Sequence, residues 1–340
     1  MPQLSGPSGR HLSAGETVTV GRHQLRLPDF LREVADHLEG TRKAPDTGLP
    51  PVADRFLGGG LTALRTAGAH TWLEYRLLTP PHSRTQPALY SALRRTACEL
   101  LDEGQADDFY FVHKSPGLRV RFHTSTARRE PAESHLLRTW NDWQRDGLIS
   151  GIGHAVYEPE QHLFGGPDSM LSVHRVFTAD SLAWLSHLSS EKPTAPAWAL
   201  SMSMIRILFT GLRIADFEDR DVWDRTRRQV GRRFEGAPPE HWPATSARLN
   251  RIWHSPQHLG AVLGPAHEPV LAQYRESIER TCDRWRDTYF TVPGAQVGPR
   301  EAAAFLIVFH WNRARLPKDW QIGISEALAH GTSEEPDHDQ

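Results

Sequence analysis

The chain has 340 residues, enough for one large domain or two smaller ones with a substantial core. Its 39% apolar and 24% charged residues are typical of a globular protein, and its net charge of -2 gives no overall attraction to nucleic acids or anionic membranes. The two cysteines, Cys98 and Cys282, are too few for a disulfide framework or a thiolate metal cluster. The first twenty residues lack the apolar core of a signal peptide, and the longest apolar run, 302–309, is too short to span a bilayer. We therefore expect a cytoplasmic protein without nucleic-acid or membrane partners.

The first 70 residues have a less regular pattern than the rest. A helix is predicted over 27–40, and the Gly- and Pro-containing stretch 40–61 is typical of a linker. We interpret the glycine run 58–60 as a loop, because no Lys-Ser or Lys-Thr pair follows it as in a phosphate-binding loop. Residues 1–70 are thus predicted to be an N-terminal extension.

Between residues 72 and 160 the pattern predicts a strand, a helix, two strands, a helix and a strand. The strands alternate apolar and polar side chains, whereas the helices place apolar residues three and four positions apart. This βαββαβ order is that of a ferredoxin-like fold, in which two helices cover one face of a four-stranded antiparallel sheet. We therefore predict an α+β fold. The expected segments are 72–78, 87–104, 108–114, 118–124, 130–147 and 149–160.

The opposite face of this sheet is predicted to be charged. Side chains two positions apart in a strand point to the same face, so the polar members of two strands gather there. Either His113 or Lys114, together with His154, would lie nearby, depending on the register. The expected members of the face are Glu74, Arg76, Arg119, Arg121 and His123.

Most of the remaining residues have helical periodicity. The segment 300–316 is apolar nearly all round and should be a buried helix. A helical layer over the open face of the sheet would turn the charged row into the wall of a cleft. The Arg-rich segment 219–236 is either a solvated helix with Arg–Asp pairs or a grip for an acidic peptide. We expect the tail, 323–340, to be frayed.

Known cofactor motifs are missing from the sequence. His254 and His258 have the spacing of metal ligands, but Pro256 between them argues against a shared helical face. The sequence has no Gly-x-Gly-x-x-Gly after a strand and no Gly-x-Ser-x-Gly. No cofactor or metal is therefore expected.

Five segments in this order resemble the C-terminal elimination domain of lantibiotic dehydratases. They are "WLEYRLLTP", "DDFYFVHKSPGLRVRF", "GLISGIGHAVYEPEQHLFGG", "SMLSVHRVFTADS" and "FHWNRARL". The resemblance covers roughly residues 70–320 and implies a domain of this type over 71–322.

Three positions depart from the pattern of the eliminating members. Where those members have an arginine in the strand before the hairpin, this chain has His113. Glu160 is kept, but the arginine expected three positions later is Leu163, and the histidine expected in the C-terminal helix is Val308. Because the family uses these residues to expel glutamate from glutamylated Ser or Thr, the chain is not expected to be an eliminase.

The chain resembles instead a branch of this family, the stand-alone thiopeptide pyridine synthases. The resemblance implies a modified precursor peptide as substrate, in which two dehydroalanines undergo a formal aza-[4+2] cycloaddition. Loss of water and of the leader peptide then gives a pyridine that closes a macrocycle. The reaction needs no redox or metal cofactor, and other thiopeptide biosynthetic enzymes are possible partners.

Tyr289, His113 and Glu74 are the predicted catalytic residues. Tyr289 is either a hydrogen-bond donor at the reacting amide or a core tyrosine, and His113 is either an acid/base or an exposed hairpin histidine. Glu74 either relays protons or pairs with Arg119 or Arg121. The predicted substrate-binding residues are Arg76, Arg119, Arg121, His154, Glu160, His310 and Asn312.

Some assignments stay open at this point. His310, Asn312 and Arg313 lie near the end of a helix, where they either contact substrate or cap the last carbonyl groups. The leader peptide has two candidate sites, residues 1–70 and the Arg-rich stretch 220–233. The alternative functions are a glutamate eliminase with relocated catalytic residues and a non-catalytic precursor-peptide-binding subunit.

Overall fold

The computed structural model describes residues 16–40, 49–58, 71–80, 86–229 and 231–330. The chain divides into two compact units, Met1–Gly68 and Ala69–Gln340.

The smaller unit contains a β-hairpin and two helical segments. Strand β1 (Thr17–Val20) pairs antiparallel with β2 (His23–Arg26), and α1 (Leu27–Leu38) follows directly, which confirms the predicted helix. The linker predicted over 40–61 is wrong for 49–58, which is helical because it has an apolar face to bury against α1. The unit's core consists of Val20, Phe30, Val34, Leu49 and Ala53.

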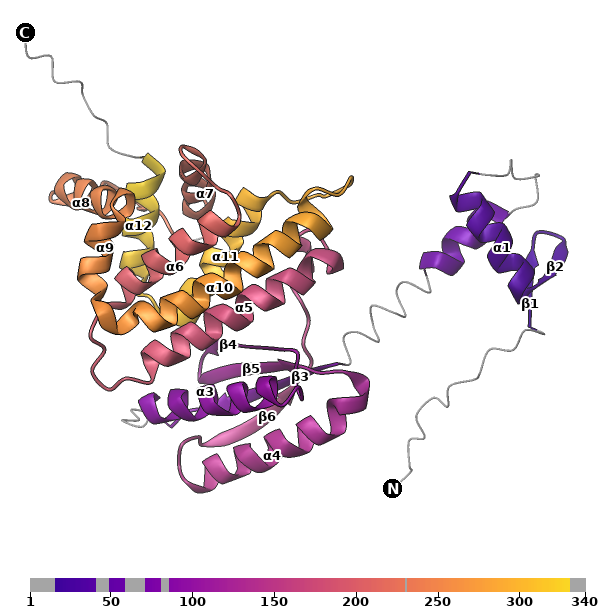
Figure 1. Cartoon of the computed structure of the whole chain (residues 1–340), viewed down its shortest axis with the longest axis horizontal. Helices are drawn as coiled ribbons and strands as arrows, with labels where there is room; N and C mark the ends of the chain where they lie inside the picture. The colour runs from indigo at the N-terminus through magenta and orange to yellow at the C-terminus, as the bar shows by residue number, and fades with distance from the viewer. Residues whose placement is uncertain (1–15, 41–48, 59–70, 81–85, 230, 331–340) are drawn as a thin grey trace, which may run out of the picture. The chain divides into compact units, whose positions relative to one another are not determined.

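The larger unit contains the predicted four-stranded antiparallel sheet, in the order β4-β5-β3-β6. Together with α3 and α4 it forms the βαββαβ arrangement, so the ferredoxin-like prediction is confirmed (Figure 1). The bounds are β3 (Trp72–Leu78), α3 (Gln86–Asp102), β4 (Asp108–Lys114), β5 (Gly117–His123), α4 (Arg129–Arg145) and β6 (Gly151–Ala155).

The register between β3 and β5 fixes the two faces of the sheet. Tyr75 lies opposite Val120 on the apolar face, where its ring contacts Trp140 of α4. Glu74 lies opposite Arg121 on the other face. The predicted separation of apolar and charged side chains is therefore present.

The rest of the larger unit is helical. As predicted, α11 is largely buried. Helix α5 is one continuous helix of 22 residues. The Arg-rich helix α7 ends at Arg227, earlier than expected. The helices are α5 (Pro167–Leu188), α6 (Ala197–Gly211), α7 (Glu218–Arg227), α8 (Trp242–His254), α9 (Pro256–Leu263), α10 (Glu268–Trp285), α11 (Pro299–Ala314) and α12 (Lys318–His330). Short helical turns are η1 (Thr126–Arg128), η2 (Gln161–Leu163), η3 (Pro265–His267) and η4 (Arg286–Phe290), the last a π-turn.

The predicted frayed tail is wrong for residues 323–330. These residues belong to α12, which packs against α7 and α8. Ile324, Ala327 and Leu328 are buried there, because their spacing of three and four places them on one helical face. The remainder of the predicted tail, 331–340, lies outside the described residues.

The helical layer is joined to the edge of the sheet. Helix α5 runs alongside β4, and α10 and α6 follow beyond it (Figure 1). Hydroxyl groups of Thr178 and Ser181 accept hydrogen bonds from the backbone N–H groups of Phe109 (3.0 Å) and Phe111 (3.4 Å). These bonds occupy donors that an edge strand otherwise leaves open. The layer therefore docks on β4 and does not lie over the whole charged face as expected, although α5 side chains reach that face at Trp72 and Tyr110.

Candidate functional site

The centre of the charged face is one carboxylate between two guanidinium groups. Arg121 Nε lies 2.7 Å from Glu74 Oε2, and both side chains are buried. Arg119 Nε lies 3.9 Å from Glu74 Oε1 and is partly open to solvent, while Arg76 is exposed. We call these four residues the arginine face. The structure thus brings together four of the predicted site residues.

Aromatic rings cover the buried end of the arginine face. The Arg121 guanidinium lies 5.0 Å from the ring centroids of both Tyr110 and Tyr157. The Tyr157 hydroxyl shares a 2.8 Å hydrogen bond with His174 Nε2. Burial lowers the pKa of His174 to about 3. Burial raises the pKa of Tyr157, and the negative charge of Glu160 raises it further. The tyrosine and the histidine are therefore neutral, and Glu160 lies close to the site.

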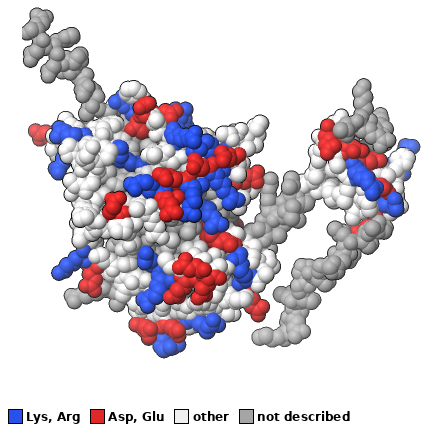
Figure 2. All heavy atoms as spheres, in the orientation of Figure 1, with Lys and Arg blue, Asp and Glu red and all other residues white. Residues whose placement is uncertain are grey.

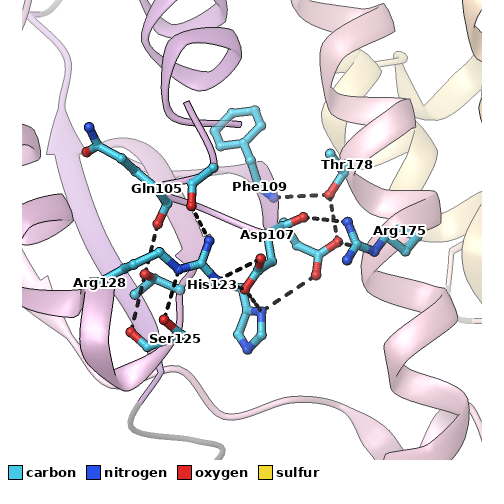
Figure 3. A network of polar contacts seen from close by, with 11 residues as sticks. Gln105, Asp107, Phe109, His123, Ser125, Arg128, Arg175 and Thr178 are labelled. Atoms are coloured by element: carbon cyan, nitrogen blue, oxygen red, sulfur yellow. Dashed lines mark hydrogen bonds and ion pairs between the residues drawn. The ribbon is translucent and has the colours of Figure 1, made fainter. Parts of the chain in front are cut away.

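Beyond these rings the same face of the sheet ends at a groove of about 620 Å³. We call it the Asp108 groove. The start of β4 and the end of β5 form one wall, which faces Arg175 and Thr178 of α5 (Figure 3). Residues of α10 line the groove beside α5. Its polar lining residues include Asp107, Asp108, His123, Arg175, Thr178, Arg280 and Arg284.

The two aspartates of the groove have different partners. Both Asp107 oxygens lie 2.9 Å from Arg128 Nη2, whereas Asp108 Oδ1 lies 3.2 Å from Arg175 Nε. His123 Nδ1 is 3.7 Å from a carboxylate oxygen of each aspartate (Figure 3). Burial raises the pKa of Asp108 to about 7, against the opposing charge of Arg175. Burial also lowers the pKa of His123, although Asp107 opposes this shift.

His113 lies on the other face of the sheet. It is paired with Leu118 in the register, so Lys114 and not His113 shares the charged face. Its Nδ1–H donates to the carbonyl oxygen of Asn312 (3.0 Å), and Nε2 is 2.9 Å from the Tyr90 hydroxyl. Burial lowers the pKa of His113 to about 4. The ring is therefore neutral, and both nitrogen atoms are occupied within the protein.

Asn312 completes this link between α11 and the sheet. Its side-chain oxygen accepts a hydrogen bond from the backbone N–H of His113 at 3.0 Å. Asn312 is thus the third side chain, after Thr178 and Ser181 of α5, that accepts a hydrogen bond from the backbone of β4. The contacts of Asn312 therefore join secondary-structure elements and lie away from the arginine face.

His154 also lies away from the charged face. It is opposite Tyr75 in the register, and the two ring centroids are 5.1 Å apart on the α4 side of the sheet. The expectation that it shares a face with the arginines is therefore wrong, since alternation along β6 puts Gly153 and Ala155 there instead.

His310 belongs to a buried polar network between helices. Its Nδ1 lies 2.6 Å from Asp180 Oδ1, and its Nε2 lies 2.9 Å from Ser201 Oγ. Burial alone would raise the pKa of Asp180, but His310 and Arg313 outweigh it and lower that pKa below its ordinary value. The order Ser–His–Asp is that of a hydrolase triad, but Ser201 is fully buried and also accepts the Trp311 indole N–H. The network therefore joins α5, α6 and α11.

Tyr289 is in the π-turn η4. Its hydroxyl accepts hydrogen bonds of 3.1 Å from the backbone N–H groups of Gln296 and Val297. It also lies against Gly165, where an added Cβ would come within 1.7 Å of the hydroxyl. Among the described residues, no contact joins Tyr289 to the arginine face.

Arg225 and Arg227 of α7 are paired with acidic residues. Arg225 lies 3.1 Å from Asp221 and 3.9 Å from Glu301, and Arg300 lies 3.3 Å from Asp221. In Figure 2, blue and red residues are interleaved on the visible face of the larger unit. These pairs favour the solvated-helix interpretation of this segment.

Among the described residues, no helix has both the length and the apolar composition to cross a membrane. In the same part of the chain, no three His, Cys, Asp or Glu side chains gather as a metal ion would require.

Residues 72–330 match the family model described as the C-terminal domain of lantibiotic biosynthesis dehydratases. The chain belongs to this family. The tRNA-dependent lantibiotic dehydratase MibB from Microbispora sp. 107891 has a similar structure, with a TM-score of 0.57 and 18% identity over 77% of this chain. The match spans only 28% of MibB. The pyridine synthase TbtD from thiomuracin biosynthesis has a TM-score of 0.51 and 13% identity, and the match covers 76% of this chain and 97% of TbtD. No curated protein sequence matches the chain.

In this member of the lantibiotic dehydratase family, the residues at the three positions that depart from the eliminating pattern offer no uncommitted polar group. His113 has both ring nitrogens occupied. Leu163 packs against the hydrophobic core, and Val308 is an aliphatic, partly buried residue of α11.

Sequence reasoning missed several residues of the site. Asp108 begins a predicted strand, and alternation back from Tyr110 could have placed it on the charged face. His174 and Arg175 come from α5, and no local pattern connects that helix with the end of the sheet.

Proposed function

We propose that the chain forms the central pyridine of a thiopeptide from two dehydroalanines of a modified precursor peptide. The reaction is a formal aza-[4+2] cycloaddition followed by loss of water and of the leader peptide. The observation that carries the proposal is that the three positions which the resemblance ties to glutamate expulsion hold His113, Leu163 and Val308. The arginine face still offers charged groups that can bind a peptide.

The length of the structural match also supports the proposal. The chain corresponds to nearly all of TbtD and to about a quarter of MibB. A match over nearly the whole of a pyridine synthase suits a reaction on a peptide that other enzymes have already modified. The precursor peptide and those enzymes are therefore the proposed partners, in the cytoplasm.

The chemistry asks mainly for positioning. Holding two dehydroalanines together in a flexible peptide contributes up to roughly 7–11 kcal/mol to catalysis in favourable cases. Arg119 and Arg76 are accessible donors that hold peptide carbonyl oxygens, with Glu74 and Arg121 fixing the buried end. The site, as proposed, works as a rigid platform with a separate source of protons.

The catalytic predictions for Tyr289 and His113 stay predictions, as does leader recognition by residues 1–70. The hydrogen bonds of both side chains within the protein favour structural roles for them. Of the three predicted catalytic residues, Glu74 is the one within the arginine face.

The test is incubation with a synthetic leader-bearing peptide that contains two dehydroalanines and thiazoles. The expected products are a macrocycle that has lost water, an intact leader carboxamide and a new pyridine absorbance. Arg119→Gln should slow product formation, whereas Arg145→Gln, an exposed arginine on α4, should not. Unchanged peptide would refute the proposal. Glutamate release from a glutamylated precursor would show an eliminase, and binding without a mass change would show a peptide-binding subunit.

A further inference from the structure

The Asp108 groove has the size and lining of a peptide-binding site. Its volume of about 620 Å³ lies within the range of ligand pockets, about 300–1,000 Å³. Hydroxyl groups from two helices line it, and they can bond to peptide amides. Two leucines, Leu171 and Leu182, add apolar surface. The hydroxyl groups belong to Ser172, Thr178, Ser277 and Thr281.

Asp108 stands out among the carboxyl groups of this region because one of its oxygens is uncommitted. Oδ1 lies 3.2 Å from Arg175 Nε and accepts a hydrogen bond of 3.5 Å from the Thr178 hydroxyl. Among the described residues, no hydrogen bond reaches Oδ2, and His123 Nδ1 lies 3.7 Å from it. Asp107 differs, since Arg128 engages both of its oxygens at 2.9 Å.

His123 is equally short of partners. Its Nδ1 is buried and has no hydrogen bond, although it lies between two carboxylates. The ring packs against Trp72, with centroids 5.0 Å apart, which fixes it at the end of the groove. An uncommitted carboxyl oxygen and an uncommitted imidazole nitrogen therefore meet beside a space that fits a peptide.

We propose that the Asp108 groove binds the reacting segment of the peptide substrate, and that Asp108 transfers protons to and from the amide that becomes the 2-azadiene. This inference rests on the proposed function.

The proton transfer balances without another reactant. Protonated Asp108 gives its proton to the amide oxygen, and the resulting carboxylate takes the proton from the amide nitrogen. The amide becomes its iminol tautomer, and Asp108 returns to its acid form. A carboxyl group with a pKa of about 7 suits both steps, because at neutral pH its acid and its base forms are similarly populated. No bond to the protein forms, and nothing is oxidised or reduced.

The charges that face Asp108 come from several elements. Asp107 precedes it in the chain, and His123 faces it from β5. Arg175 faces it from α5, and Arg280 and Arg284 line the groove from α10. Arg128 of η1 forms an ion pair with Asp107. Arg175 lowers the pKa of Asp108 and Asp107 raises it, so variants of either residue will move the pH profile.

The test is a comparison of Asp108→Asn with the wild-type chain under single-turnover conditions. The asparagine keeps the size of the side chain and can still accept a hydrogen bond from Arg175. We expect the cyclisation rate at saturating peptide to fall by about 100-fold or more, the usual range for loss of an acid/base group. The dissociation constant of a fluorescently labelled peptide should stay unchanged. Asp142→Asn, an exposed aspartate of α4, serves as the control and should keep the wild-type rate.

The pH profile separates proton transfer from a structural effect. The wild-type rate should depend on a group with an apparent pKa near 7, and this dependence should be missing from Asp108→Asn. A wild-type rate and pH profile in the variant would overturn the inference and leave the proposed function standing. If the wild-type chain itself forms no pyridine, the proposed function fails. Circular dichroism and a thermal melt of both proteins confirm that any lost activity is not lost folding.

Discussion

The raised pKa of Asp108 predicts that the groove reduces the stability of the protein at neutral pH. The pKa rises from 3.8 to about 7 on folding. A difference of about three units corresponds to roughly 4 kcal/mol, at about 1.4 kcal/mol for each unit. The folded state holds this proton more tightly than the unfolded chain does. The free energy of unfolding should therefore fall as the pH rises from about 4 to 7. The Asp108→Asn variant removes the buried charge and should be more stable than the wild type above pH 7.

Urea unfolding followed by tryptophan fluorescence measures this effect, since the chain has 11 tryptophans. The stability advantage of Asp108→Asn should grow by about 2–3 kcal/mol between pH 5 and pH 8. Asp107→Asn is the matched comparison, because its partly exposed carboxylate pairs with Arg128 and its loss should cost about 0–1 kcal/mol. An advantage of Asp108→Asn that stays constant over this pH range would refute the reasoning. A gain in stability with a loss of activity would follow the usual trade-off at functional sites.

Three further substitutions test the predicted catalytic residues. Glu74→Gln leaves the buried Arg121 guanidinium without its charge partner and should cost about 3–5 kcal/mol in urea unfolding, whereas Glu74→Gln combined with Arg121→Met should recover much of this loss. His113→Ala removes hydrogen bonds to α3 and α11 and should cost about 2–3 kcal/mol, and a cyclisation rate that remains normal in the folded fraction would exclude an acid/base role. Tyr289→Phe leaves two backbone N–H groups without an acceptor and should cost about 1–3 kcal/mol, and a near wild-type rate would exclude a role as proton donor.

The sheet could be predicted because its central strands carry clear alternation. In β5 the apolar Val120 stands between Arg119 and Arg121, so a single register satisfies both faces. The pairing of Glu74 with Arg121 then follows from the order of the strands. The part of the candidate site that lies on these two strands, the arginine face, could therefore be predicted from the sequence.

The face of His113 could not be read from β4. Phe109, Tyr110 and Phe111 are all fully buried, because one side of β4 faces α3 and the other faces α5 and the aromatic cluster. A strand that is buried on both sides has no alternation to fix its register. His113 follows this stretch, so its side was open until the pairing with Leu118 was known.

Two local errors have signals that were present in the sequence. In the segment 49–58, Pro50 and Pro51 stand in the first helical turn, where proline is favoured. The same prolines are also typical of a linker, which is the basis of the wrong prediction. In the tail, Ile324, Ala327 and Leu328 have helical spacing. Neither segment has enough apolar surface to be stable alone, and each is helical because another helix covers its apolar face.

The arginine face and the Asp108 groove lie on one side of the sheet. In the proposed reaction the first holds the peptide and the second transfers the protons. Along β5, Arg119 and His123 are four residues apart, which is roughly 13 Å in an extended strand. An extended peptide of four or five residues would reach from the accessible guanidiniums to the groove. Arg121 lies between the two ends, and the rings of Tyr110 and Tyr157 cover its guanidinium. Trp72 stands opposite His123 at the groove end, with its ring centroid 4.5 Å from that of His174. A peptide held by its carbonyl groups at one end would thus present an amide to Asp108 at the other. Because one peptide must occupy both ends, Arg119→Gln and Asp108→Asn should be energetically coupled in a double-mutant cycle of the cyclisation rate, whereas either combined with Arg145→Gln should be additive.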